Sequence, residues 1–312
     1  MEPAKTISVV VPCYNEVESL IAFNQNLFQH LPPNYSYEVI YVNDGSQDNT
    51  LQVLYALAEQ NLCVKYISFS RNFGHQNALK AGYDYATGDC AISLDADLQH
   101  PPAVIPELIA KWEEGFEIVN TIRKDHKTIS AKKQLSSKLF YGFMRKFSDI
   151  NIENGMADFR LVDKKVLKQL KLFHENFLFF RGIFPWMGFR QANVVFTAND
   201  RYAGTTKYTF RKMLKFATSG VTSFSVKPLR LSVYLGVVIA CFSFLYGIYA
   251  GYVYLFTDKA ITGWASVIIS VLFVGGINLL MLGIIGEYLG KLFIENKQRP
   301  NYLISESNMI EI

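Results

Sequence analysis

Two aspartates separated by a single residue are the strongest candidates for chemistry in this sequence. Asp95 and Asp97 directly follow the apolar run at 91–94, which predicts a short buried strand. Side chains two positions apart on a strand point the same way, so we expect both carboxylates to face a similar direction. Paired hard oxygen ligands suit Mg²⁺ or Mn²⁺, which proteins hold through one or two carboxylates together with substrate phosphates. The pattern alone also fits a solvated turn, but the strand before it and Gln99 after it favour a metal site.

Polar residues follow the other apolar runs of the first half of the chain as well. These runs alternate with helical patterns and lie at 7–11, 37–42, 64–69 and 91–94, with a further short run at 118–121. The alternation predicts an α/β fold with a mostly parallel sheet and helices on both faces. Ligands bind at the carboxyl ends of the strands in such sheets. Asp44 is therefore a candidate to bind a nucleobase or ribose, with a simple Asp-Gly turn as the alternative.

The last third of the chain is apolar enough to cross a membrane. No acidic residue occurs between Asp200 and Asp258, and the stretches 231–257 and 260–286 contain no charged residue. Each exceeds the roughly 20 residues that a helix needs to span the hydrocarbon core, so we predict two transmembrane helices. Basic residues cluster on the outer sides of the pair, which places both chain ends in the cytoplasm by the positive-inside tendency. No apolar signal segment precedes Ile7, so nothing is expected to send the amino-terminal domain across the membrane.

These patterns divide the chain into five predicted parts. They are a cytoplasmic catalytic domain at 1–206, amphipathic juxtamembrane helices at 207–230, transmembrane helices at 231–257 and 260–286, and a cytoplasmic tail at 287–312 whose final residues are expected to be loose. A basic amphipathic segment at 123–146 fits a solvated helix and a membrane-surface helix equally well. The four cysteines show no paired spacing, which argues against a disulfide scaffold or a cysteine-based metal site.

Four ordered motifs strongly resemble those of family two glycosyltransferases of the GT-A, Rossmann-like fold. They are VVVPCYNE at 9–16, NDGS at 43–46, RNFGH at 71–75 and LDADLQHPP at 94–102. Two later motifs, ADFRL at 157–161 and RYAGTTKY at 201–208, look like those of the polyisoprenyl-phosphate branch. That branch includes bactoprenol glucosyltransferases and dolichol-phosphate mannose synthases, and the two terminal spans match the former type. The resemblance covers nearly the whole chain.

The resemblance implies a role for individual residues. The residues implied in nucleotide-sugar binding are Pro12, Tyr14, Glu16, Asp44, Asp95 and Gln99, and those implied in metal binding are Asp95 and Asp97. The resemblance places Asp158 and Arg160 at the reaction centre. It implies that Arg201 and Lys207 bind the lipid phosphate or the diphosphate. Ala157 stands where the family more often has glycine, which puts the local backbone geometry beside Asp158 in question.

Elementary chemistry constrains the role of Asp158. A phosphate monoester has a second pKa of about 6, so an acceptor phosphate is already largely ionised at neutral pH. The harder task is to bring two anions together, for which the metal, Arg160, Arg201 and Lys207 are candidate sources of positive charge. We expect Asp158 to orient the acceptor or the sugar, with general base catalysis as the alternative that the family suggests.

The activity implied is inverting, metal-dependent transfer of a hexose, foremost glucose from UDP-glucose, to undecaprenyl phosphate, giving a β-linked product. GDP-mannose with a dolichyl or other polyprenyl phosphate is the second candidate. A non-catalytic membrane protein that binds a lipid phosphate or nucleotide sugar is the alternative of another class. The expected location is the plasma or inner membrane, multi-pass, with the catalytic domain cytoplasmic, in a homo-oligomer and without nucleic acid.

Two other classes are disfavoured by missing motifs. A dinucleotide-dependent oxidoreductase would carry GxGxxG after the first strand, and a processive polysaccharide synthase would carry QxxRW; this sequence has neither. His75 and His100 lie in polar stretches and are interpreted as capping or structural residues rather than metal ligands. The aromatic cluster at 177–184, with Trp186, is interpreted as packing, and sugar stacking as the lesser alternative.

Overall fold

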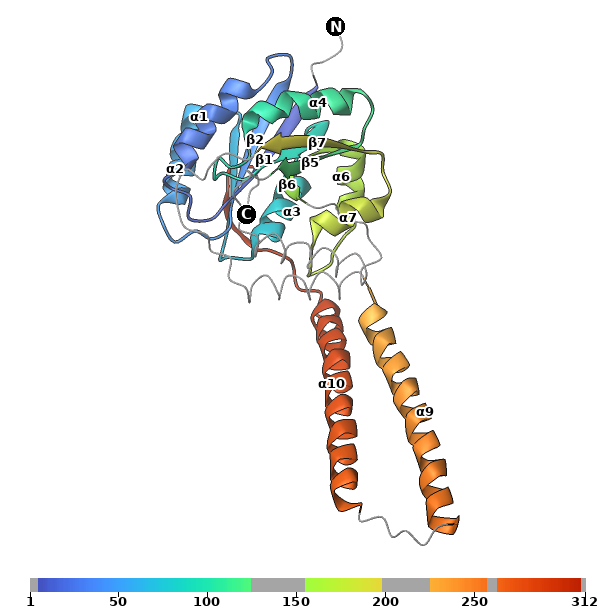
Figure 1. Ribbon diagram of the computed structural model, residues 1–312. Coiled ribbons are helices and arrows are strands. Elements are labelled where there is room, and N and C mark those ends of the chain that lie inside the picture. Colours follow the sequence, from blue (N-terminus) through green and yellow to red (C-terminus); the bar gives the residue numbers. More distant parts are fainter. Residues whose placement is uncertain (1–4, 125–154, 198–224, 257–262, 310–312) are drawn as a thin grey trace.

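The computed structural model describes residues 5–124, 155–197, 225–256 and 263–309 (Figure 1). Within these residues the catalytic domain contains one eight-stranded sheet in the order β7-β5-β6-β4-β1-β2-β3-β8. The strands are β1 Thr6–Cys13, β2 Ser36–Asn43, β3 Val64–Phe69, β4 Cys90–Ser93, β5 Ile118–Lys124, β6 Met156–Asp163, β7 Gln191–Thr197 and β8 Ile304–Ser307. The helices are α1 Leu20–His30, α2 Thr50–Gln60, α3 His75–Tyr85, the short η1 Pro102–Val104, α4 Ile105–Glu113, α6 Lys164–Leu170, α7 Phe180–Met187, α9 Lys227–Phe256 and α10 Trp264–Asn296.

The centre of the sheet is parallel, as the sequence predicts. Strand β1 pairs in parallel with β2 and β4, β2 pairs in parallel with β3, and β5 with β7. All five expected strands are present. Strand β6 was not expected; it lies antiparallel between β4 and β5 and carries the ADFRL motif into the middle of the sheet.

Helices cover both faces of the sheet, which confirms the predicted architecture. Along β1 the side chains alternate: Val9 and Val11 pack in a cluster with α1, α2 and α4, whereas Val10 packs in another with α3, α6 and α7. The period of two in an extended strand produces this division. Helix α3 approaches β1 closely because Gly82 has no side chain; a Cβ there would lie 2.1 Å from Cγ1 of Val10.

Two long helices extend away from the catalytic domain (Figure 1). Within α9 the stretch Ser232–Tyr249, and within α10 the stretch Phe273–Asn296, are long and apolar enough to cross a membrane, and neither stretch is buried inside the protein. The expected span 231–257 therefore coincides with most of α9. The expected span 260–286 overlaps α10 from Trp264 onwards, and this helix continues without a break past Glu287 and Lys291 to Asn296.

The chain after the membrane hairpin is ordered as far as Met309, so the residues 306–309 that were expected to be loose are in contact with the domain. Helix α10 continues to Asn296, and the chain then returns to the catalytic domain, where β8 pairs antiparallel with β3. Tyr302 stacks on Phe69 with ring centroids 5.0 Å apart, and its hydroxyl donates a hydrogen bond to Oδ2 of Asp84 at 3.0 Å. The open edge of β3 supplies the backbone partners that a four-residue strand lacks by itself.

The contacts of Tyr302 allow a test of whether the segment after α10 packs against the catalytic domain. We expect Tyr302→Ala to lower the free energy of unfolding by about 1–3 kcal/mol, because a half-buried stacked ring is lost. Tyr302→Phe keeps the stack and loses the hydrogen bond, at a cost of about 1 kcal/mol. Thermal unfolding of the full chain in detergent would measure both effects. Leu303→Ala is the matched control, because Leu303 is 53% exposed and should change stability little. Equal melting temperatures for Tyr302→Ala and Leu303→Ala would contradict the contacts described.

Candidate active site

The candidate site lies where the parallel strands end and β6 crosses beside them. Asp44 follows β2, and Asp95 and Asp97 follow β4, at the carboxyl edge that the sequence singles out. Strand β6 runs antiparallel to β4 with Arg160 opposite Ser93. Asp158, two residues earlier on β6, is therefore placed just beyond the end of β4, next to Asp95.

Asp158 is a buried carboxylate that binds three side chains at once. Arg181 binds it through two bonds, Nε to Oδ1 at 3.2 Å and a terminal nitrogen to Oδ2 at 3.0 Å. Arg160 donates to Oδ1 at 3.1 Å, and the Gln76 amide donates to Oδ2 at 3.4 Å. The Asp158 side chain is only 8% exposed. Burial would raise the pKa of Asp158, but the opposing charges of Arg181 and Arg160 and the hydrogen bonds from Arg181 hold it well below its usual range.

Arg160 is buried behind Asp158. None of its surface is exposed, its guanidinium donates to the Ala157 carbonyl at 2.9 Å, and it lies 4.7 Å from the ring centroid of Phe184. The arginine therefore supports Asp158 from the protein interior. Its charge reaches the site only through that carboxylate.

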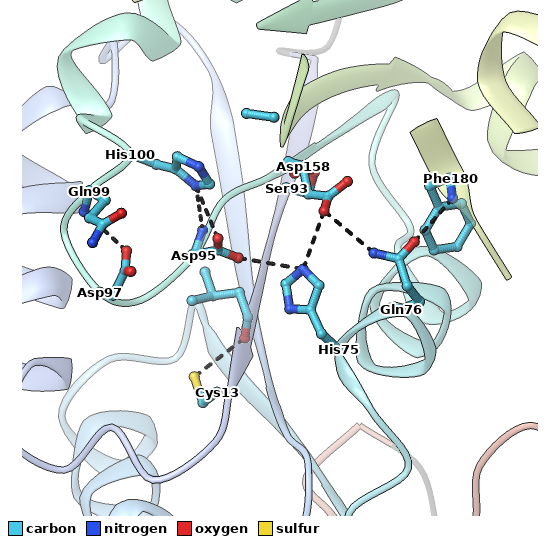
Figure 2. A network of polar contacts seen from close by, with 12 residues as sticks. Cys13, His75, Gln76, Ser93, Asp95, Asp97, Gln99, His100, Asp158 and Phe180 are labelled. Atoms are coloured by element: carbon cyan, nitrogen blue, oxygen red, sulfur yellow. Dashed lines mark hydrogen bonds and ion pairs between the residues drawn. The ribbon is translucent and has the colours of Figure 1, made fainter. Parts of the chain in front are cut away.

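Arg181 completes this ion-pair group and was missed by sequence reasoning. It lies in the first turn of α7, and its side chain is 30% exposed. Gln76 connects α7 to Asp158 because its carbonyl oxygen accepts a bond from the Phe180 backbone N–H at 3.0 Å while its amide binds Asp158 (Figure 2). The signal in the sequence was a single arginine inside the aromatic stretch at 177–184, which was interpreted only as packing.

Asp95 is held between two histidines. The Asp95 backbone N–H donates to Nδ1 of His100 at 3.1 Å, and His100 is buried with its ring stacked on Phe159. A neutral His100 must then carry its proton on Nε2. His75, at the start of α3, places Nε2 at 3.7 Å from Oδ1 of Asp95 and 3.8 Å from Oδ2 of Asp158, so it lies between the two carboxylates (Figure 2).

The two aspartates of the DxD motif lie in a turn and not on the strand. Strand β4 ends at Ser93, and Leu98 adopts a positive φ of 62°. The Asp97 carboxylate accepts the Gln99 backbone N–H at 3.0 Å, whereas Asp95 points towards the histidines (Figure 2). The strand periodicity used to orient both carboxylates alike therefore does not apply.

Asp44 fixes the loop that precedes α3. Its carboxylate accepts the backbone N–H groups of Phe73 at 2.6 Å and Gly74 at 3.0 Å, and only 3% of the residue is exposed. Burial raises the pKa of Asp44, and these backbone bonds partly oppose the increase. Gly45 is needed beside it, because its φ is 64° and a Cβ would lie 2.3 Å from the Arg71 carbonyl carbon. Asp44 thus places the residue that follows Gly74, which is His75.

The remaining predicted donor residues lie at the end of β1 and in the turn after β4. Pro12 is buried in β1, and Tyr14 and Glu16 are half-buried in the turn that follows. The Glu16 backbone N–H donates to Oγ1 of Thr50 at 3.0 Å, which joins this turn to the start of α2. The Gln99 side chain accepts a bond from Arg123 at 3.1 Å. Arg201, Lys207 and the basic segment 125–146 lie outside the described residues, as do most of the expected juxtamembrane helices.

Comparison with protein families shows to which family this chain belongs. The family model "Glycosyl transferase family 2" matches residues 8–171, which contain all the motifs of the sheet edge and Asp158. The chain belongs to glycosyl transferase family 2. A second model, "GtrB C-terminal hairpin", matches residues 227–292, which contain α9 and most of α10.

Relatives within the family are similar over almost their whole length. A protein of Bacillus subtilis (strain 168) named as the uncharacterised glycosyltransferase YkcC is 43% identical over 97% of this chain and 94% of its own. The bactoprenol glucosyl transferase of Shigella phage SfV is 41% identical over 96% of this chain and 97% of its own. A protein of Escherichia coli (strain K12) named as a prophage bactoprenol glucosyl transferase homologue is 40% identical over 96% of this chain and 98% of its own.

A solved structure supports the fold of this family two glycosyltransferase. A mannosyltransferase from Pyrobaculum calidifontis, solved with GDP-Man and Mn²⁺, has a TM-score of 0.50 and 17% identity. The likeness covers 73% of this chain and 65% of the mannosyltransferase. At this identity the comparison supports the GT-A arrangement of the sheet and helices.

Proposed function

We propose that this protein transfers a hexose, foremost glucose from UDP-glucose, to a polyisoprenyl phosphate such as undecaprenyl phosphate, with inversion at the anomeric carbon. The observation that carries the proposal is the likeness to the phage SfV bactoprenol glucosyl transferase, which extends over the catalytic domain and the membrane hairpin alike. Similarity confined to the catalytic domain would have left the acceptor open. The site also has the required chemistry, with carboxylates at a sheet edge and arginine charge beside them.

A divalent cation, Mg²⁺ or Mn²⁺, fits the carboxylates at the donor end. Among the described residues no group of three His, Cys, Asp or Glu side chains forms a metal site of its own. Asp95 and Asp97 would instead supply two oxygen donors, with the donor diphosphate and water as the other ligands, which is the usual manner of Mg²⁺ binding. Such a cation supplies charge neutralisation to a departing diphosphate. The bond from the Asp95 backbone N–H to Nδ1 of His100 helps to keep this turn in place.

We assign the nucleoside to the edge formed by the ends of β1 and β2. Tyr14 and Glu16 are half-exposed there, and Gln99 lies in the turn that carries Asp97. Asp44 contributes in a different way from the one expected, because its two oxygens already accept backbone bonds from Phe73 and Gly74. Its primary effect is then to position the loop before α3.

Asp158 acts as an orienting residue and not as a general base. Its oxygens accept bonds from Arg181, Arg160 and Gln76, and its lowered pKa makes it a weak proton acceptor. The acceptor phosphate needs no base, because it is already largely ionised at neutral pH. Asp158 instead holds the Arg181 guanidinium beside the position where two anionic substrates must meet, with Arg160 buried behind it.

A pH–rate profile tests this assignment. Because the pKa of Asp158 lies below the usual carboxylate range of about 4, the residue stays ionised throughout pH 5–8 and cannot cause an inflection there. We expect the wild type and Asp158→Asn to show profiles of the same shape, displaced in height. A limb between pH 5 and 8 that is present in the wild type and absent in Asp158→Asn would support the general base instead.

The membrane arrangement follows from the two long helices. We propose that α9 and α10 both cross the membrane, with the catalytic domain and both chain ends on the cytoplasmic side, as the flanking basic residues indicate. The pairing of β8 with β3 agrees with this arrangement, because it places the segment that follows α10 on the same side of the membrane as the catalytic domain. The exposed surfaces of α9 and α10 would also allow copies of this protein to associate as a homo-oligomer.

A donor panel distinguishes the proposed function from its alternatives. Purified full-length protein with Mn²⁺ would be mixed with UDP-glucose, another UDP-hexose or GDP-mannose, with and without undecaprenyl phosphate, and release of nucleoside diphosphate measured. We expect release with UDP-glucose that depends on the lipid phosphate. Preference for GDP-mannose would favour the mannose synthase alternative. No release with any donor would favour a binding protein without turnover.

A further inference from the structure

Two guanidiniums converge on the buried carboxylate of Asp158. One carboxylate, that of Asp158, faces two guanidiniums, those of Arg160 and Arg181, at 3.0–3.2 Å. Both arginines remain charged at every physiological pH. A guanidinium held in this place, where anionic substrates are expected, is suited to contact an anion if part of it is exposed.

Only one of the two arginines can present this charge to a ligand. Arg160 has no exposed surface and is enclosed by the Ala157 carbonyl and the Phe184 ring. The Arg181 side chain is 30% exposed. Its guanidinium is a planar fork whose orientation is fixed by the paired bonds to Asp158, and such a fixed fork suits phosphate oxygens.

The chain segment just before Arg181 is attached to the membrane hairpin. The Asn176 backbone N–H and side chain donate to the two oxygens of Glu295 at 2.9 and 3.1 Å, and the Lys291 ammonium lies 5.3 Å from the Phe177 ring centroid. Both Glu295 and Lys291 belong to α10. Helix α7 accordingly lies at the end of the domain from which the long helices extend (Figure 1). An anionic headgroup carried by a lipid would approach the site from this side.

We propose that Arg181 binds the phosphate of the membrane-borne acceptor, with Asp158 as the residue that positions it. The inference rests on the proposed function and assigns to the same site a cation that the family motifs do not include. Gln76 supports the geometry from the other side, because it joins Asp158 to the backbone of Phe180, the residue before Arg181. A phosphate could also come from the donor diphosphate, so the test must separate the two sources.

The test uses Arg181→Gln and Arg181→Lys in the full chain, reconstituted in lipid nanodiscs. Binding of farnesyl phosphate without donor reports the acceptor phosphate, and farnesol is its uncharged counterpart. Binding of UDP with Mn²⁺ reports the donor diphosphate. Arg190→Gln is the matched control, because Arg190 is exposed and its guanidinium lies over the Phe116 ring at 5.4 Å, outside the site.

We expect Arg181→Gln to weaken farnesyl phosphate binding by about 10- to 100-fold, the usual effect of losing hydrogen bonds to a charged group. Binding of farnesol and UDP should change less than about twofold, and KM for undecaprenyl phosphate should rise more than kcat falls. Arg181→Lys should fall between, because it keeps the charge without the fork. We expect both variants to fold, because Arg160 still pairs with the buried Asp158.

Two results would overturn the inference. Unchanged farnesyl phosphate binding in Arg181→Gln would remove Arg181 from the acceptor site. UDP binding weakened as strongly as farnesyl phosphate binding would assign Arg181 to the donor diphosphate. The proposed function fails separately: a wild type that binds farnesyl phosphate through Arg181 but transfers no hexose to any polyprenyl phosphate would contradict the activity and leave the phosphate site intact.

Discussion

Replacing Asp158 by Asn should reduce glycosyl transfer by at least about 100-fold and also destabilise the protein. The substitution keeps the shape of the side chain but removes the charge that Arg160 and Arg181 share. Arg160 has no exposed surface, and a buried charge that loses its partner typically costs about 3–5 kcal/mol. The free energy of unfolding and the transfer rate, measured on the same preparation, would show both losses.

The loss of stability tests the ion pairs of Asp158, whereas the pH–rate profile separates orientation from base catalysis. Asp163→Asn is a suitable control, because Asp163 ends the same strand and accepts bonds from Trp112 and Lys165 away from the site. We expect Asp163→Asn to transfer sugar at close to the wild-type rate. An inactive Asp158→Asn with wild-type stability would contradict the ion pairs.

Acidification should weaken this ion-pair group only at very low pH. The folded-state pKa of Asp158 is depressed, so its contribution to stability is complete above the unfolded value of about 3.9 and is lost as the pH falls through the lower folded value. The stability difference between the wild type and Asp158→Asn should therefore be constant from pH 5 to 8.

Replacing Asp95 or Asp97 by Ala should abolish metal-dependent use of the donor, with a rate reduction of about 1,000-fold or more. Each change removes one of the two carboxylates proposed to bind the cation at the turn after β4. Calorimetric titration of UDP in the presence and absence of Mn²⁺ measures the effect directly. Wild-type protein should bind UDP more tightly with Mn²⁺, and the variants should lose this difference.

A carboxylate elsewhere on the surface provides the control for this loss. Glu113 is exposed and pairs with Lys5 at 2.9 Å, so Glu113→Gln should keep the full effect of Mn²⁺. The Asp95→Ala variant should also keep its turn, because the His100 contact uses the backbone N–H of residue 95. Variants that still transfer sugar in a manganese-dependent way would defeat the metal assignment.

The parallel half of the sheet could be predicted because its information is local. Buried strands in an α/β fold are largely apolar runs, and β1 to β4 occur as such runs followed by polar motifs. The residues that follow β2 and β4 must then share one edge of the sheet. Asp44 and Asp95 were found by this reasoning, although the side-chain direction of Asp97 depends on a turn with a positive φ that periodicity does not describe.

The other half of the site depends on pairing between distant segments. Asp158 lies beside Asp95 only because β6 inserts antiparallel next to β4, and the two strands are more than 60 residues apart in the chain. A family motif placed Asp158 at the reaction centre, but local sequence could not identify Arg181 as its partner. Strand β8 is similarly hidden, since ISES has little apolar character and depends on the edge of β3.

The most direct test of the proposed activity is the mass of the lipid product. Full-length protein would be incubated with UDP-glucose, Mn²⁺ and undecaprenyl phosphate, and the extracted lipid analysed by mass spectrometry. The proposal predicts undecaprenyl phosphate that has gained one hexose, formed with Mn²⁺ and lost when the cation is chelated. Unmodified lipid after complete consumption of UDP-glucose, or no consumption of any donor, would contradict it.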